Sequence, residues 1–312
     1  MTKLLKPLAL VPGSTIAVVA PASAAKAERI ERGCENLERL DYRVTQTIAK
    51  READGYFSAR LELRLAELQG ALTRRDIRGV FCSRGGYGSA ELLDRLKTAR
   101  MKQAKIFCGF SDLTSLHIFL WQRLHWVTFY GPLVAGGFDA GANATGGYDP
   151  DTFMCAMTAT HRGWSAPLRG ETLVRGSAAG TLLGGCVTLL ETSIGTPWEL
   201  DTRGAILLLE DRGVKPYQLD RMLLHLKLAG KFKGVRGIVL GEFPECDAPE
   251  GSTVSVNDVC KRILGPLKIP VVYGAPVGHT PRPMLTLPLG VRVRLHALGE
   301  GRLDILEPAV RA

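Results

Sequence analysis

Short, uninterrupted apolar runs recur along the chain, and most of them lead into a segment with helical periodicity. Residues 15–20 form the first of these runs, and the pattern returns at residues 79–82, 105–109, 205–209 and 237–241. A strand that is apolar on both sides is buried on both faces, as in parallel sheets covered by helices. The alternation therefore predicts an α/β fold in which helices flank parallel sheets.

The remaining predicted elements complete this alternation. Helices are expected near residues 30–40, 61–72, 89–96, 113–121, 216–228 and 256–264, further strands begin at residue 44 and span residues 271–273, and a closing hairpin joins residues 291–295 to 302–306. The periodicity fails over a glycine-rich stretch between residues 130 and 170. We therefore expect an N-terminal domain over residues 1–135, a linker over 136–173 and a C-terminal domain over 174–312.

Charge and composition exclude several classes of protein. Lys and Arg number 40 against 31 Asp and Glu, an excess of +9, but the basic residues are spread out and lack interleaved aromatics. No nucleic-acid partner is expected, because such proteins carry a denser basic stripe, whereas an anionic small substrate suits this charge. No apolar run reaches the ~18–20 residues that span a bilayer, and no signal-peptide core is present, so we expect no membrane association and a soluble, cytoplasmic protein.

The cysteines and histidines give no sign of a metal site. The seven cysteines are scattered, with no CxxC pair, which favours reduced thiols in a reducing compartment. Neither His117 nor His125 has a second ligand at metal-binding spacing, and no HExxH motif occurs. No metal is therefore expected.

The first candidate catalytic residue follows the strand at residues 105–109, since functional groups in open α/β sheets lie past the carboxyl ends of strands. In the sequence Gly109-Phe-Ser-Asp112, a small residue two before Ser111 permits a tight turn that exposes Oγ at a helix N-terminus. Such a serine equally suits an N-cap, and Leu113 stands where a hydrolase elbow has its second glycine. Ser111 is therefore a candidate nucleophile or a helix cap.

Two later strands end in an acid and a histidine. Glu210-Asp211 follows one strand and would orient a base or cap the helix expected at residue 216, and His279 lies in a proline-rich loop after another. A lone histidine is more often a structural hydrogen-bonding residue than a catalyst. Together, Ser111, Glu210 and His279 occur in the order nucleophile, acid, base, each at a strand end, as a hydrolytic triad requires.

A glycine loop, Arg-Gly-Gly-Tyr-Gly at residues 84–88, follows the strand at residues 79–82. It matches neither the GxGxxG dinucleotide pattern nor the phosphate-binding P-loop. Its amides would face a phosphate, a carboxylate or a tetrahedral oxyanion.

Seven motifs follow one another in a recognisable order. They are Ser83-Arg-Gly-Gly-Tyr-Gly88, Gly109-Phe-Ser-Asp-Leu-Thr114, Tyr130-Gly-Pro132, Gly180-Thr-Leu-Leu-Gly-Gly185, Leu209-Glu-Asp211, Pro276-Val-Gly-His279 and Leu287-Pro-Leu-Gly290. In these motifs the chain resembles the LD-carboxypeptidases, the muramoyltetrapeptide carboxypeptidases of the S66 serine-peptidase family. The resemblance spans nearly the whole chain.

The resemblance implies an N-terminal parallel-sheet domain with the serine and a C-terminal α/β domain with the glutamate and histidine, the active site lying between them. The family's catalytic triad falls on Ser111, Glu210 and His279, and its oxyanion-hole amides fall on Asp112 and Gly86. It implies a homodimer that needs no cofactor. The implied substrate is a murein tetrapeptide, cleaved at the L,D bond between diaminopimelate and terminal D-alanine during peptidoglycan recycling.

Arg84 and Gly85 of the glycine loop are the candidate substrate-binding residues. The substrate carboxylate needs a cation, which Arg84 would supply, against a role for Arg84 in structural hydrogen bonds alone. The chain departs from the family pattern at Cys186, where Asn is usual, and at Gln218, where Arg is common. Two other functions stay open: a microcin C immunity-type hydrolase of acylated aminoacyl-adenylates, and a catalytically dead ligand-binding protein. Between residues 185 and 201 only Trp198 offers a platform for adenine, which favours the peptide; diaminopimelate and lysine remain alternatives for its third residue.

Overall fold

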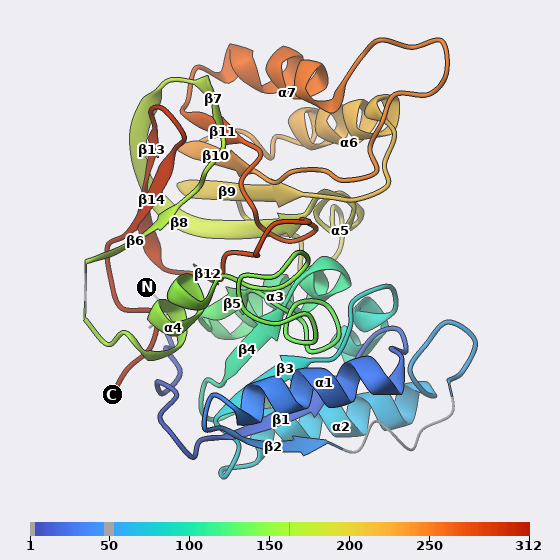
Figure 1. The fold of residues 1–312 in the computed structure, drawn as a ribbon. Coiled ribbons are helices and arrows are strands. Elements are labelled where there is room, and N and C mark those ends of the chain that lie inside the picture. The colour runs from blue at the N-terminus through green and yellow to red at the C-terminus, as the bar shows by residue number, and fades with distance from the viewer. Residues whose placement is uncertain (1–3, 47–52, 162) are drawn as a thin grey trace. The chain divides into compact units, whose positions relative to one another are not determined.

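The computed structural model describes residues 4–46, 53–161 and 163–312. These residues form two compact units, each built on its own sheet (Figure 1). The first unit contains the described residues up to 160 together with 282–290 and 308–312, and the second contains the rest. The chain therefore enters the first unit three times.

The first unit has a six-stranded sheet in the order β12-β5-β4-β3-β1-β2. Its strands are β1 (Thr15–Val19), β2 (Arg43–Gln46), β3 (Gly79–Cys82), β4 (Ile106–Gly109), β5 (Thr128–Tyr130) and β12 (Leu287–Leu289), and its α-helices are α1 (Ala27–Glu38), α2 (Leu61–Thr73), α3 (Thr114–Leu124) and α4 (Pro150–Thr158). Strands β1 to β5 run parallel, and β12 closes the edge antiparallel to β5. Every residue of β3 and β4 is buried, as their apolar runs predict.

The second unit has an eight-stranded sheet in the order β6-β14-β13-β8-β9-β10-β11-β7. Its strands are β6 (Trp164–Pro167), β7 (Glu171–Val174), β8 (Gly176–Cys186), β9 (Ala205–Glu210), β10 (Gly237–Leu240), β11 (Val271–Tyr273), β13 (Arg292–Ala297) and β14 (Arg302–Ile305), and its α-helices are α5 (Val187–Thr192), α6 (Pro216–Leu228) and α7 (Val256–Leu264). Strands β8 to β11 are parallel, and the outer strands pair antiparallel. The α/β class with parallel sheets is therefore confirmed.

One predicted helix has a different geometry. Residues 89–96 were expected to be α-helical, but Ser89–Arg95 forms a 3₁₀-helix that begins after Gly88, whose φ is 118°. Its first N–H, that of Ser89, donates to the Asp112 carboxylate at 2.8 Å. The tighter 3₁₀ turns suit a short connection held at its start by a neighbouring loop.

The boundaries of the two units differ from those that the sequence predicts. The stretch 136–173, expected to be a linker, contains α4, β6 and β7. The C-terminal segments return to the first unit through pairings between distant residues: Asp149 N–H donates to the Met284 carbonyl at 2.9 Å, and Arg311 N–H donates to the Pro7 carbonyl at 2.9 Å. No local sequence signal marks such pairings, because the residues of each pair lie more than a hundred positions apart in the chain.

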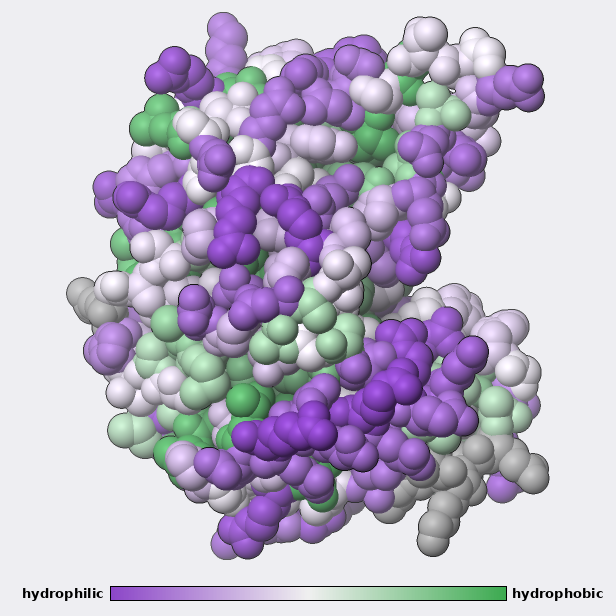
Figure 2. All heavy atoms as spheres, in the orientation of Figure 1, coloured by the Kyte–Doolittle hydropathy of each residue, from purple (hydrophilic) through white to green (hydrophobic). Residues whose placement is uncertain are grey.

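The surface of α1 follows its amphipathic sequence. Ile30, Cys34 and Leu37 are buried, whereas the opposite charged face forms the hydrophilic band that Figure 2 shows over this helix. Within the described part of the chain, no helix is both long enough and apolar enough to cross a bilayer.

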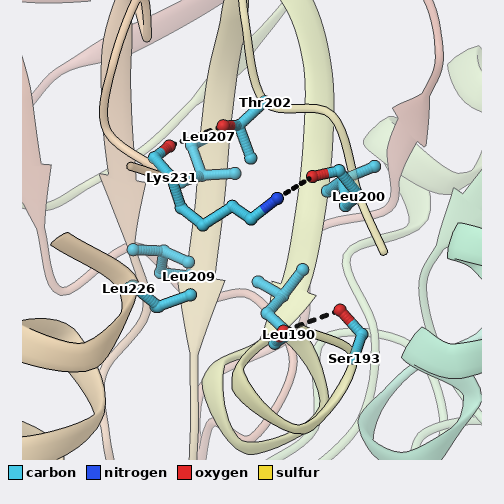
Figure 3. Close-up of a pocket in the computed structure, with 8 residues that line it drawn as sticks. All are labelled: Leu190, Ser193, Leu200, Thr202, Leu207, Leu209, Leu226 and Lys231. Atoms are coloured by element: carbon cyan, nitrogen blue, oxygen red, sulfur yellow. Dashed lines mark hydrogen bonds between the residues drawn. The ribbon is translucent and has the colours of Figure 1, made fainter. Parts of the chain in front are cut away.

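A small gap in the second unit lies beside β9, α5 and α6. It is lined by five leucines together with Ser193, Thr202 and Lys231 (Figure 3). Lys231 Nζ donates to the Leu200 carbonyl at 3.0 Å, so the ammonium is held against one wall. The free space is about 10 Å³, which is about what a single water requires, so this gap is a packing defect and not a ligand site.

The gap leads us to predict how one substitution in its wall changes the free energy of unfolding. Leu207 lines it from β9 and is 1% exposed, whereas Leu228, the last residue of α6, is 78% exposed. We expect Leu207→Ala to lower the free energy of unfolding by about 2–5 kcal/mol, because it enlarges an existing cavity. Leu228→Ala should change it by less than about 0.5 kcal/mol. Urea denaturation followed by circular dichroism measures both, and equal losses would contradict this view of the core.

Candidate active site

Ser111 stands in a strained turn between β4 and α3. Its φ is +67°, a conformation that residues other than glycine rarely adopt, and it opens the 3₁₀ turn Ser111–Leu113 that leads into α3. Strained strand-to-helix turns are typical of exposed nucleophiles. Neither this turn nor α3 has a side-chain cap hydrogen bond, so Ser111 is not the helix cap that the sequence allowed.

The glycine loop lies in close contact with Ser111. A methyl group at Gly85 would lie 2.8 Å from Ser111 Cβ and 3.0 Å from its Oγ, and one at Gly86 would lie 2.5 Å from Ser23 Oγ. Gly86 also has a φ of +96°. Only glycine permits this approach, so the backbone of the loop lies against Ser111 without a side chain between them. Ser111 N–H itself donates to the Tyr130 hydroxyl at 3.3 Å.

Asp112 ties the serine turn to the segment that follows the glycine loop. Its carboxylate accepts the Ser89 N–H at 2.8 Å, and its carbonyl accepts the Ser89 hydroxyl at 2.7 Å. Burial raises the pKa of Asp112, and the hydrogen bonds from Ser89 and Gly88 oppose this rise. The side chain of Asp112 is thus structural, while the oxyanion role of its amide and that of Gly86 stays a prediction.

Arg64 is a residue of this region that the sequence analysis missed. It is 1% exposed, and its Nη1 donates to the carbonyls of Pro21 and Gly88, both at 2.9 Å. Its Nε donates to the Ala59 carbonyl at 3.0 Å, and its Cζ lies 4.3 Å from the centre of the Phe57 ring. Arg64 therefore joins three loops. The sequence analysis placed Arg64 in the helix predicted over residues 61–72, and no local pattern signals that this charged side chain is buried.

Arg84, the candidate for the substrate carboxylate, is exposed, and its Nη1 donates to the Ala24 carbonyl at 2.6 Å. One guanidinium N–H is thus used in holding the loop, out of the five that arginine carries. Its role in binding substrate stays a prediction.

An exposed aromatic cluster lies beside the glycine loop. Tyr56 is 66% exposed and Tyr87 is 56% exposed, and their ring centres lie 5.4 Å apart, with Phe57 in contact with both. The sequence suggested Trp198 as the one local platform for a planar group. That expectation was incomplete, because the residues near 56 and near 87 meet only in the folded chain.

Glu210 and His279 meet in the second unit. His279 Nδ1 and the His279 backbone N–H both donate to Glu210 Oε2, each at 2.8 Å. The carboxylate is 0% exposed and the histidine side chain 17% exposed. Because a carboxylate only accepts, the neutral ring carries its proton on Nδ1 and its lone pair on Nε2, the form that a general base requires.

The backbone at Gly278 approaches Glu210 so closely that it leaves no room for a side chain. Gly278 has a φ of +65°, and a Cβ there would lie 2.3 Å from the Glu210 carboxyl carbon. The local sequence Val-Gly-His thus positions the histidine by bringing its own backbone onto the acid.

Opposing effects act on the pKa of His279. Burial lowers it, but the charge of Glu210 and the hydrogen bond to it, together with Asp211, outweigh burial and leave the pKa above its ordinary value. Glu210 therefore stabilises the imidazolium that forms when the ring takes a proton.

Structural hydrogen bonds or burial account for three further residues, Asp211, Gln218 and Cys186. Asp211 accepts hydrogen bonds from the N–H and the hydroxyl of Thr188, in the first turn of α5, at 2.8 and 2.7 Å. Gln218 Oε1 accepts the Lys215 N–H at 2.8 Å and so caps α6, which explains how this departure from the family pattern is used. Cys186 is buried at the junction of β8 and α5. Neither acid caps α6, so the capping alternative for the acidic pair does not hold.

His117 is structural. Its Nδ1 lies 2.8 Å from Thr128 Oγ1 and its Nε2 lies 2.9 Å from the Gly109 carbonyl, and burial lowers its pKa to about 4. It stays neutral and links β4 to β5. Among the described residues, no group of three His, Cys, Asp or Glu side chains is arranged to hold a metal ion.

The structure thus brings together Glu210 and His279 in one unit, and Ser111, Asp112, Gly85 and Gly86 in the other. Comparisons with known proteins agree with this division. The LD-carboxypeptidase N-terminal domain matches residues 16–131, and the LD-carboxypeptidase C-terminal domain matches residues 179–295. The chain belongs to the LD-carboxypeptidase family.

The relatives of this chain in the S66 serine-peptidase family are named either carboxypeptidases or microcin C7 self-immunity proteins. A probable murein peptide carboxypeptidase from Bacillus subtilis is 32% identical over 294 residues, which cover 93% of this chain and 91% of the relative. The structure of a muramoyltetrapeptide carboxypeptidase from Oxalobacter formigenes is 31% identical with a TM-score of 0.84, covering 96% of this chain and 100% of that one. The microcin C7 self-immunity protein MccF in complex with aspartyl sulfamoyl adenosine is 26% identical with a TM-score of 0.87, covering 98% and 99%.

The Glu210–His279 pair of this LD-carboxypeptidase family member predicts a titration. In Glu210→Gln the raising effect of the charge is lost while burial remains, so the pKa of His279 should fall from above its ordinary value of about 6.5 to below it. Proton NMR of the ring measures the change, and Glu300→Gln, an exposed acid of the same unit, should leave it unchanged. An unchanged His279 pKa in Glu210→Gln would refute the assigned pairing.

The raised pKa of His279 also makes the stability of the fold depend on pH. Because the folded pKa of His279 is raised, protonation stabilises the fold fully below the unfolded pKa, and this contribution is lost as pH rises through the folded value. Glu210→Gln should reverse this dependence, because a folded pKa below the unfolded value makes the free energy of unfolding fall as pH drops, and urea denaturation over a pH series measures it.

Proposed function

We propose that this protein is a serine-type L,D-carboxypeptidase that releases the terminal D-alanine of murein tetrapeptides. The observation that carries the proposal is the Ser111 turn at φ +67°, which lies against the glycine loop, together with a histidine oriented by a buried carboxylate. A strained serine beside backbone amides is suited to acyl transfer, and an oriented histidine supplies its base. Relatives named murein peptide and muramoyltetrapeptide carboxypeptidases support the choice of substrate.

The proposed mechanism uses residues of both units. His279 Nε2 takes the proton from Ser111 Oγ, which attacks the carbonyl carbon preceding the terminal D-alanine. Glu210 stabilises the imidazolium, and the amides of Asp112 and Gly86 bind the tetrahedral oxyanion, each donor contributing roughly 3–4 kcal/mol. His279 then protonates the leaving amine, D-alanine departs, and water hydrolyses the acyl-enzyme. Arg84 would bind the terminal carboxylate with the N–H groups that Ala24 does not use.

Removing the nucleophile and the base tests this mechanism. Ser111→Ala and His279→Ala should each lower kcat by roughly 10⁴–10⁶-fold, and the double variant should lose little more, because the two groups act as one unit. Ser165→Ala, an exposed serine on β6, is the matched control and should retain activity. Circular dichroism should show an unchanged fold in all variants. Losses that multiply in the double variant would contradict a shared catalytic role.

A second candidate function is hydrolysis of an acylated aminoacyl-adenylate. The exposed Tyr56 and Tyr87 rings beside the glycine loop favour it, since exposed aromatic side chains stack on planar bases. The MccF relative, which was crystallised with aspartyl sulfamoyl adenosine, favours it as well. The same aromatic faces would also contact the apolar face of a sugar attached to the peptide, so the cluster by itself does not decide between the substrates.

A product assay with both substrates distinguishes the two candidate functions. We expect D-alanine release from a murein tetrapeptide with a kcat/KM at least about 100-fold above cleavage of an aspartyl-adenylate analogue, and also above a tetrapeptide ending in L-alanine. The L-terminus would turn its carboxylate away from the same donors. Efficient adenylate cleavage with an inert tetrapeptide would overturn the proposal in favour of the second candidate, and Tyr56→Ala with Tyr87→Ala should then weaken that cleavage.

A further inference from the structure

A separate recess lies at the edge of the first unit's sheet where β3 and β4 begin. It encloses about 280 Å³, and its polar lining consists of Arg75, Asp76, Arg78, Gln103 and Lys105. The glycine loop and the Ser111 turn follow the opposite ends of these two strands. Four residues at ~3.3 Å each separate the two edges, so the recess is distinct from the candidate active site.

Lys105 is the buried centre of this recess. Its side chain belongs to a residue that is only 4% exposed, and its Nζ donates to the Ile77 carbonyl at 2.5 Å. An ammonium group has three donors. Within the described residues that carbonyl is its one hydrogen-bond acceptor, so two donors remain for a ligand in the recess. A buried ammonium without an anionic partner is costly, and an anion bound here would offset that cost.

The recess itself supplies only one negative charge, and a neighbouring arginine shares it. Arg75 and Arg78 add two cations, and Asp76 is the one carboxylate of the lining. Both of its oxygens already accept from Arg74, at 3.1 and 2.6 Å. Burial lowers the pKa of Lys105; Asp76 opposes this and Arg78 adds to it. The recess therefore carries an excess of positive charge.

We propose that this recess binds a small oxyanion with at least two negative charges, either a phosphate group or a compact polycarboxylate. Lys105 donates to it from within, Arg75 and Arg78 pair with it at the rim, and the Gln103 amide is a further donor. The recess volume of about 280 Å³ leaves room for a phosphate or a compact polycarboxylate. It lies just below the ~300–1,000 Å³ of pockets for drug-sized ligands.

Isothermal titration calorimetry of the whole chain with inorganic phosphate and with citrate, in buffers of equal ionic strength set with chloride, tests the site. We expect saturable one-to-one binding of one of the two anions, which identifies the phosphate or the polycarboxylate as the preferred chemistry. Lys105→Met should weaken that binding about tenfold or more. Arg75→Gln, at an exposed position where a loss of folding is not expected, should weaken it about threefold or more.

Two control variants test whether the anion binds in the recess and not elsewhere on the protein. Lys102→Gln removes an exposed lysine from the same loop outside the recess, and Arg84→Gln removes the arginine of the catalytic glycine loop. Both should bind the anion as the wild type does. Binding of neither anion beyond the chloride control would overturn the proposal. So would affinity that is unchanged in both Lys105→Met and Arg75→Gln, or lost in Arg84→Gln.

Discussion

The contact between the buried Glu210 carboxylate and His279 is the interaction on which the second unit's part of the site depends. One oxygen accepts both the ring N–H and the backbone N–H of the histidine, so the acid fixes the side chain and the loop at once. Gly278 and Gly241 approach so closely that a Cβ at either position would overlap Glu210. A buried charge that loses its partner is strongly destabilising, and this cost keeps the end of β9 and the loop after β11 in one arrangement.

The first unit meets a comparable demand with different means. The turn between β4 and α3 holds Ser111 at φ +67°, a conformation that costs free energy and persists only where the surroundings fix it. The surroundings here are Tyr130 on the Ser111 amide, Ser89 on Asp112, and the buried Arg64, which joins the Gly88 carbonyl to two other loops. The candidate-site loops are thus held by hydrogen bonds to Tyr130 and Asp112, which lie in the recognised motifs, and by Arg64, which lies outside them, and the glycines provide the space.

The sequence selected its candidate residues because they follow apolar strands. Ser111, Glu210 and His279 each come after such a run, and the structure pairs Glu210 with His279 and places Ser111 in a strained turn, while their catalytic roles stay a proposal. Arg64 could not be found in this way, since its burial comes from contacts with residues 21, 59 and 88. The Tyr56–Tyr87 cluster and the cationic recess around Lys105 were missed for the same reason, as each joins separate segments that have no shared local pattern.

The sequence by itself determined the elements marked by a continuous apolar run or by apolar periodicity: β1, β3, β4, β9 and β10, most of the helices, and the β13–β14 hairpin. Apolar spacing decides these locally, because a strand or helix must bury one face or both wherever it packs. Only the tertiary structure decided the return of residues 282–290 and 308–312 to the first unit, and the 3₁₀ form of residues 89–95. Those outcomes rest on hydrogen bonds between distant residues, such as Arg311 with Pro7 and Ser89 with Asp112, and their strength depends on where the rest of the chain has already placed each partner.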